Sequence, residues 1–145
     1  MHMSKSAAAA GMPLRRRKVA AAAFTLASFA LLSGCAAQQS SFTDLQGSRE
    51  SQDELPQLAD YAYDDVDEST SRFIAEHEGT SLWLAAGLED STVCLVADAG
   101  AEAWVVTCGA GAFNSSGVTG TFEVAPDGAT APEGSMQISE NVHAW

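Results

Sequence analysis

The residues of this chain that point most directly to chemistry are its three cysteines, Cys35, Cys94 and Cys108. Cys35 ends the tetrapeptide Leu-Ser-Gly-Cys, whose small residues let a peptidase hold the chain extended beside a thiol. A cysteine thiolate is a good nucleophile and can be alkylated. Cys94 and Cys108 lie in separate apolar runs, 14 positions apart. The first cysteine is therefore a candidate for modification, and the other two are candidates for a disulfide.

The segment before Cys35 has the layout of an export signal. Residues 15–18 are Arg-Arg-Arg-Lys, and residues 19–32 form a 14-residue apolar run. Such a run has the length of a signal-peptide core and is too short to span a bilayer comfortably. With this leader, Leu32-Ser33-Gly34-Cys35 resembles the lipobox of bacterial lipoproteins. The resemblance implies that lipid-transfer machinery attaches diacylglycerol to Cys35, and that a signal peptidase cuts between Gly34 and Cys35. Export by the general or the twin-arginine route stays open.

Cys94 and Cys108 predict a disulfide across a β-hairpin. If residues 92–97 and 103–108 are neighbouring antiparallel strands with the cysteines directly opposite, the connecting loop is Gly-Ala-Glu (residues 100–102). Three-residue loops with glycine are known hairpin connections. An exported chain meets oxidising conditions, and a redox-active pair would need closer spacing or a lowered pKa. The bond closes a loop of about 15 residues, which stabilises a fold by about 3 kcal/mol in the chain-entropy model.

Charge is distributed very unevenly along the chain. All 19 Asp and Glu residues follow residue 43, whereas five of the seven Lys and Arg residues precede residue 19. Residues 35–145 therefore have 19 acids against two arginines, a net charge of −17. A nucleic-acid partner is excluded because it requires a basic surface. A polytopic membrane protein is excluded because only one short apolar run is present.

Composition divides the chain into three parts. Residues 1–34 are expected to be the signal peptide that the lipobox resemblance implies, residues 35–64 a disordered acidic tether, and residues 65–145 a small α+β extracytoplasmic domain. The tether is predicted because the segment is poor in apolar residues and cannot offset its ordering entropy. Its apolar residues at 55–63 are either a short docking segment for a partner or a local contact with the domain.

The predicted fold class of the domain is α+β, with one N-terminal helix and a small antiparallel sheet of about five strands, stapled by the disulfide. The helix is predicted over residues 65–78, because Asp65 is a good N-cap, apolar residues recur with the helical period, and Gly79 is a suitable C′ residue. Alternating or continuous apolar runs bounded by turn residues predict the strands. These runs are residues 81–86, 92–97, 103–108, 118–125 and 135–144.

No set of side chains in the sequence matches a known catalytic pattern, so neither a catalytic residue nor a cofactor is predicted. His77 and His143 are the two histidines after the leader, and a small hydrolase or transferase would have to use one of them. Trp83 and Trp104 lie on predicted strands; together with His77 they are weak candidates for ligand binding, although a core position explains an aromatic residue equally well.

A metal site is not predicted either. The acidic residues Asp64, Asp65, Asp67 and Glu68 lack the EF-hand loop pattern. Helix capping explains three of them. A cation-binding envelope protein is therefore kept only as an alternative reading.

Beyond the lipobox, residues 66–145 loosely resemble small lipoproteins of high-GC Gram-positive bacteria that have no assigned activity. The resemblance rests on Ser-Leu-Trp-Leu-Ala at 81–85, Val-Cys-Leu-Val at 93–96, Thr-Cys-Gly at 107–109 and Val-Ala-Pro-Asp-Gly at 124–128. It implies an extracytoplasmic module and transfers no catalytic residue. The sequence thus favours a membrane-anchored, non-enzymatic binding or interaction module at the cell envelope, whose partner would be an envelope protein.

Overall fold

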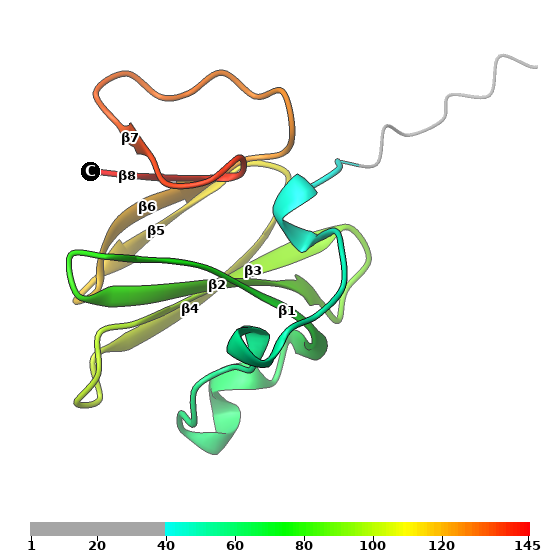
Figure 1. Cartoon of the computed structure of the whole chain (residues 1–145), viewed down its shortest axis with the longest axis vertical. Helices are drawn as coiled ribbons and strands as arrows, with labels where there is room; N and C mark the ends of the chain where they lie inside the picture. Colours follow the sequence, from blue (N-terminus) through cyan, green and yellow to red (C-terminus); the bar gives the residue numbers. More distant parts are fainter. Residues whose placement is uncertain (1–39) are drawn as a thin grey trace, which may run out of the picture. The chain divides into compact units, whose positions relative to one another are not determined.

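Two antiparallel four-stranded sheets make up most of the molecule (Figure 1). The computed structural model describes residues 40–145, so the predicted leader and Cys35 lie outside the described residues. Sheet A has the strand order β1 (Val66–His77), β2 (Thr80–Gly87), β3 (Thr92–Asp98) and β4 (Trp104–Ala110). Sheet B has the order β5 (Phe113–Gly117), β6 (Gly120–Val124), β8 (Val142–Ala144) and β7 (Met136–Gln137).

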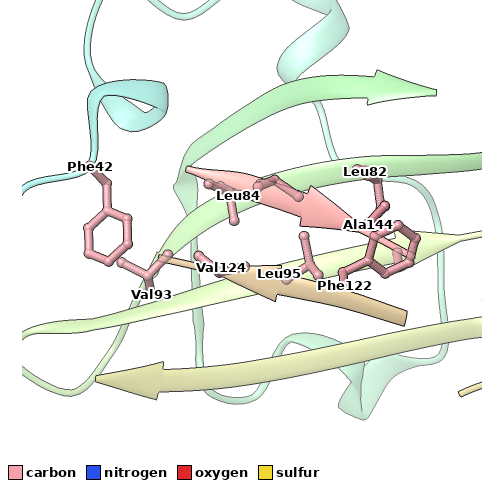
Figure 2. Close-up of a cluster of buried hydrophobic side chains, with 10 residues drawn as sticks. Phe42, Leu82, Leu84, Val93, Leu95, Phe122, Val124 and Ala144 are labelled. Atoms are coloured by element: carbon pink, nitrogen blue, oxygen red, sulfur yellow. The ribbon is translucent and has the colours of Figure 1, made fainter. Parts of the chain in front are cut away.

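The main core lies between the two sheets. Because side chains alternate along a strand, every second residue of β2 and β3 points toward sheet B. Leu82, Leu84 and Leu95 of sheet A pack with Phe122 and Val124 of sheet B (Figure 2), and each is no more than 1% exposed. This apolar layer holds the two sheets together.

The predicted hairpin and disulfide are confirmed. The runs predicted as the first three strands form β2, β3 and β4, and Cys94 is paired with Cys108 in register. A disulfide joins them, with Cα atoms 4.0 Å apart. At the hairpin end the N–H of Ala99 donates to the carbonyl of Ala103 at 2.8 Å. The loop of residues 100–102 is therefore the three-residue connection that the cysteine spacing predicts.

The predicted N-terminal helix is wrong, because residues 66–77 form strand β1 instead. Pairing with β2 jumps from Asp67↔Ala86 to Arg72↔Leu84, and again between Phe73 and Ala75. These bulges insert extra residues and shift the two-residue period. Apolar residues of a bulged strand then recur at spacings that imitate a helix.

The glycine expected to end that helix belongs to a hairpin turn. Glu78 and Gly79 both have positive φ, 49° and 81°, between the paired residues His77 and Thr80. Two central residues with positive φ define the type I′ turn that joins antiparallel strands. Gly79 therefore turns β1 into β2.

The sheet prediction is coarser than the structure. The predicted loop at residues 109–117 contains β5, and the predicted last strand at 135–144 is divided into β7 and β8. The structure has eight strands in two sheets instead of about five in one, and the mostly β architecture replaces the predicted α+β class.

The segment predicted as a disordered tether is folded from residue 41 onward. It contains three short 3₁₀ helices, η1 (Thr43–Leu45), η2 (Ser51–Asp53) and η3 (Asp60–Tyr63). Phe42 is 7% exposed and joins the main core. Leu55 and Tyr63 pack on the opposite face of sheet A, against a cluster of Val66, Ala85 and Cys94. Of the two readings of residues 55–63, the structure shows the local contact for Leu55 and Tyr63, whereas Tyr61 stays exposed.

Polar side chains hold this segment against the domain. The segment is therefore ordered although its low apolar content predicts disorder. The carboxylate of Asp127 accepts hydrogen bonds from the hydroxyls of Ser41 and Thr43 and from the N–H of Thr43. The N–H of Asp44 donates to the side-chain carbonyl of Asn141 at 2.9 Å. We call this set of bonds the terminal latch. These hydrogen bonds offset part of the entropy cost of ordering the segment, which the burial of its few apolar residues would not offset alone.

Candidate functional site

A groove runs along the outer face of strand β4, the face that points away from sheet B. Its first hollow has a volume of ≈ 780 Å³ and lies between residues 57–61 and the β3–β4 hairpin. Tyr61 and Trp104 line both this hollow and a second one, which continues along β4 past Val106 to Cys108. Cys108 and Asp65 also line a third hollow. We call these three adjoining hollows the β4 groove.

Two aromatic rings form the most prominent feature of the groove. The ring of Tyr61 lies 5.8 Å from that of Trp104 between centroids, with the planes tilted by 52°. Tyr61 is 67% exposed although it is a large aromatic residue. Trp104 is half-buried at the start of β4. A paired, accessible set of aromatic faces suits a flat apolar group or a cation.

The segment that carries Tyr61 is held in place by its neighbours. Ala62 is buried, and its N–H donates to the carbonyl of Ala59 at 2.8 Å. The hydroxyl of Tyr63 donates to the carbonyl of Pro56 at 2.7 Å. Burial raises the pKa of Tyr63 to about 12, and the negative charges of Glu68 and Asp98 add to the shift. Helix η3 thus presents Tyr61 outward while the adjacent residues anchor it.

The groove is acidic throughout. Asp98 and Glu102 line the first hollow, Asp64 and Asp65 the second, and Asp65 and Glu89 the third. Among residues 40–145, neither a lysine nor an arginine lines any of the three hollows. The hollows of the groove are therefore lined by carboxylates without a basic side chain among them.

The two arginines of the described segment are engaged elsewhere. Arg49 donates to the hydroxyl of Ser71 at 3.0 Å. Arg72 donates to backbone carbonyls that include that of Gly47, at 2.8 Å. The groove therefore attracts cations and repels anions.

The residues predicted from the sequence as site candidates lie in different places. Trp104 lies in the β4 groove, whereas Trp83 is 9% exposed and packs edge-on against Phe73. The indole N–H of Trp83 donates to the carbonyl of Gln52 at 3.2 Å, which makes Trp83 a core anchor for η2. Cys108 of the disulfide lines the groove, and its partner Cys94 is fully buried.

The two histidines lie apart from the groove. His77 is half-buried at the end of β1, with its ring 6.4 Å from that of Phe122. His143 is 4% exposed on β8, and its Nδ1 has no hydrogen-bond partner among residues 40–145. Neither histidine lines any of the three hollows of the groove.

Tyr61 is the site residue that the sequence does not single out. It lies in residues 55–63, which the sequence offers as a whole as either a docking segment for a partner or a local contact with the domain. The available signal is a second tyrosine two positions later, at the end of a segment whose apolar residues are few. Only the packing of Tyr63 and Ala62 shows that the segment lies against sheet A.

The part of the chain that the structure describes is a mostly β domain with two four-stranded antiparallel sheets and an acidic, aromatic groove. Comparison with protein-family models, curated proteins and solved structures finds no match to this chain. Within residues 40–145, no helix is long and apolar enough to cross a membrane. No group of three or more metal-ligating side chains occurs in the same range.

Proposed function

We propose that this chain is a lipid-anchored extracytoplasmic lipoprotein that acts as a binding module at the cell envelope, with the β4 groove as its binding surface. The leader and the tetrapeptide ending at Cys35 support the anchor. The Cys94–Cys108 disulfide supports an oxidising compartment, where such bonds persist. Under this proposal Cys35 is the lipidated N-terminus of the mature protein.

The observation that carries the binding role is the exposed aromatic pair. A soluble domain usually buries its large aromatic residues, and exposed ones in a concave surface are typical of interaction sites. Tyr61 is 67% exposed beside Trp104, while the comparable Trp83 is buried. Aromatic side chains of this kind contribute much of the binding energy in protein interfaces.

The anchor is tested by metabolic labelling with a palmitate analogue. The wild-type chain should incorporate the label, and Cys35→Ala should lose it and accumulate as an uncut precursor. A double variant, Cys94→Ala with Cys108→Ala, is the matched control and should keep the label. Labelling of the Cys35→Ala variant would disprove lipidation at this residue.

The binding role is tested by placing a photo-crosslinking amino acid at Tyr61 in the full chain in its native envelope. A defined crosslinked product should form, and it should disappear when Trp104→Ala is added. The same crosslinker at Val118, which is 77% exposed and does not line the groove, is the control and should not give this product. Identical products at both positions would contradict a role for the groove.

A further inference from the structure

Strand β4 is an edge strand, and its free edge runs beside the groove. Sheet A ends at β4, which pairs with β3 on one side only. In an antiparallel pair, opposite residues alternate between hydrogen-bonded and non-hydrogen-bonded positions, and the latter have the closer Cα atoms, about 4.5 Å apart. The Cα atoms of Cys94 and Cys108 are 4.0 Å apart, which assigns them to a non-hydrogen-bonded position.

The hairpin end gives the same alternation independently. The N–H of Ala99 donates to the carbonyl of Ala103, so this pair is hydrogen-bonded. The hydrogen-bonded positions then continue along β4 at every second residue after Ala103. The residues between them, which are Trp104, Val106 and Cys108, are the non-hydrogen-bonded positions. The N–H and C=O groups of these three residues therefore point away from β3, toward the free edge. Among residues 40–145, no backbone hydrogen bond outside the strand ladders uses them.

The same three residues line the groove with their side chains. Trp104, Val106 and Cys108 are successive outer-face positions of β4, and all three line the second hollow. Cys108 is exposed although its partner Cys94 is fully buried, so the edge is accessible there. An extended segment that pairs with this edge would place every second side chain beside the groove.

The charge of the groove determines what kind of segment fits. Residues 40–145 contain 19 acidic residues and two arginines, and neither arginine lines the groove. A second copy of this domain would bring a further acidic edge against the first, which is unfavourable. Lysine or arginine side chains would instead meet Asp98 and Glu102 and stack on the rings of Tyr61 and Trp104.

Building on the proposed function, we propose that the β4 groove binds an extended, lysine- or arginine-rich segment of a partner protein, which adds to sheet A as a fifth strand antiparallel to β4. In antiparallel pairing, residues directly opposite each other share a face of the sheet. The partner residues whose side chains enter the groove are therefore the same ones whose N–H groups bond β4. The alternate residues of the partner segment have their side chains on the other face of the sheet, and their N–H groups point away from β4.

This register can be tested with synthetic peptides. The probe is an acetylated and amidated peptide of alternating Lys and Thr, titrated against the full chain purified in detergent from cells that process it. We expect saturable binding that weakens as salt is added, because exposed charges are screened. The same peptide with Glu in place of Lys should not bind. N-methylation of the Lys amides should weaken binding at least about tenfold, whereas N-methylation of the Thr amides should change it less than about twofold.

Protein variants provide a second arm. Trp104→Ala should weaken binding of the Lys-Thr peptide about tenfold, since it removes one face of the aromatic pair. Trp145→Ala, which removes a tryptophan that is 48% exposed and does not line the groove, is the matched control and should leave binding unchanged. Circular dichroism of both variants checks that a loss of binding is not a loss of folding.

Besides an absence of binding by the Lys-Thr peptide, three outcomes would overturn the inference. They are equal binding of the Lys and Glu peptides, equal effects of N-methylation at Lys and at Thr, and a dimer of the chain that forms through β4. If the Lys-Thr peptide does not bind but the crosslinker at Tyr61 still gives a Trp104-dependent product, this inference fails and the proposed function stands. If both experiments are negative, this inference and the proposed binding role both fail, and the anchor at Cys35 keeps its separate test.

Discussion

The two faces of sheet A are both covered, but by different kinds of interaction. Sheet B covers the inner face with apolar side chains, and Leu82, Leu84 and Leu95 are completely buried there. Residues 51–65 cover part of the outer face with a smaller apolar cluster and with two hydrogen bonds. The carboxylate of Asp53 accepts one from the N–H of Phe73, and the carbonyl of Gln52 accepts the other from the indole of Trp83. The inner contact depends on apolar area removed from water, and the outer contact depends on a few satisfied polar groups.

This difference shows why the groove lies where it does. A face closed by a complete apolar layer leaves no accessible surface for a ligand. A face closed by a segment of short 3₁₀ helices leaves hollows beside the segment, and Tyr61 and Trp104 line two of the three hollows of the β4 groove. Ligand sites are commonly built in this way, on loops that a rigid sheet supports.

The largest effect is expected on the inner face. Leu84→Ala removes a fully buried side chain from the main core, and it should lower the free energy of unfolding by about 3 kcal/mol. Urea unfolding followed by tryptophan fluorescence measures the change. Leu88→Ala, at a position 65% exposed, is the control and should shift stability by less than about 0.5 kcal/mol. Similar losses for both variants would mean that the inner face is not the dominant core.

A smaller effect is expected on the outer face. Asp53 is 4% exposed, and its carboxylate accepts hydrogen bonds from the N–H groups of Phe73 and Glu50, each at 2.7 Å. Asp53→Ala leaves both donors unpaired and should cost about 2 kcal/mol.

The same variant should release residues 49–60 while sheet A stays intact. Limited proteolysis is the measurement, and new cuts should appear in this segment without loss of the β signal in circular dichroism. The control is Asp90→Ala, at an exposed turn residue, which should add no cut. Global unfolding of the Asp53 variant would show that the two faces are not independent.

The smallest effect is expected for the stability that the terminal latch contributes at acidic pH. A hydrogen bond from Asn141, reinforced by bonds from Thr43 and Ser41, lowers the pKa of Asp127 below its ordinary value of 3.8. Because the folded pKa is the lower one, the latch contributes stability above the unfolded pKa and loses it as pH falls through the folded pKa.

Asp127→Asn removes this titration, so the stability difference between wild type and variant should shrink as pH falls below 3.8. Thermal unfolding over a series of acidic buffers measures it, and the difference cancels the titration of the other carboxylates. A difference that does not depend on pH would show that the charge of Asp127 does not strengthen the latch.

The sequence predicted the parts of the fold that depend on regular alternation. Strands β2, β3 and β4 follow from continuous apolar runs between turn residues, and the spacing of Cys94 and Cys108 predicts their disulfide and hairpin. The sequence predicts a helix at strand β1 because the bulges of this strand break the two-residue period. Local patterns contain no information about such insertions, which are fixed by the partner strand.

The candidate site was only half predictable. The sequence singles out Trp104 as a residue, but it offers its partner Tyr61 only as part of residues 55–63, inside a segment predicted to be a disordered tether. That segment is ordered by bonds such as those of Asp127 with Ser41 and Thr43, whose partners are more than 80 positions apart. Propensity and composition describe neighbouring residues, so they do not detect contacts of this range.

The terminal latch also constrains the order in which the domain folds. Asp44 bonds Asn141 across 97 positions, and Asn141 lies four residues before the end of the described chain. Contacts this distant in sequence close only after the chain between them is available, and they slow folding. Asp44, near the start of the described segment, therefore cannot form its bond until Asn141, near the end of that segment, is available. A chain that is synthesised from its N-terminus would complete sheet A before the terminal latch can hold residues 41–44.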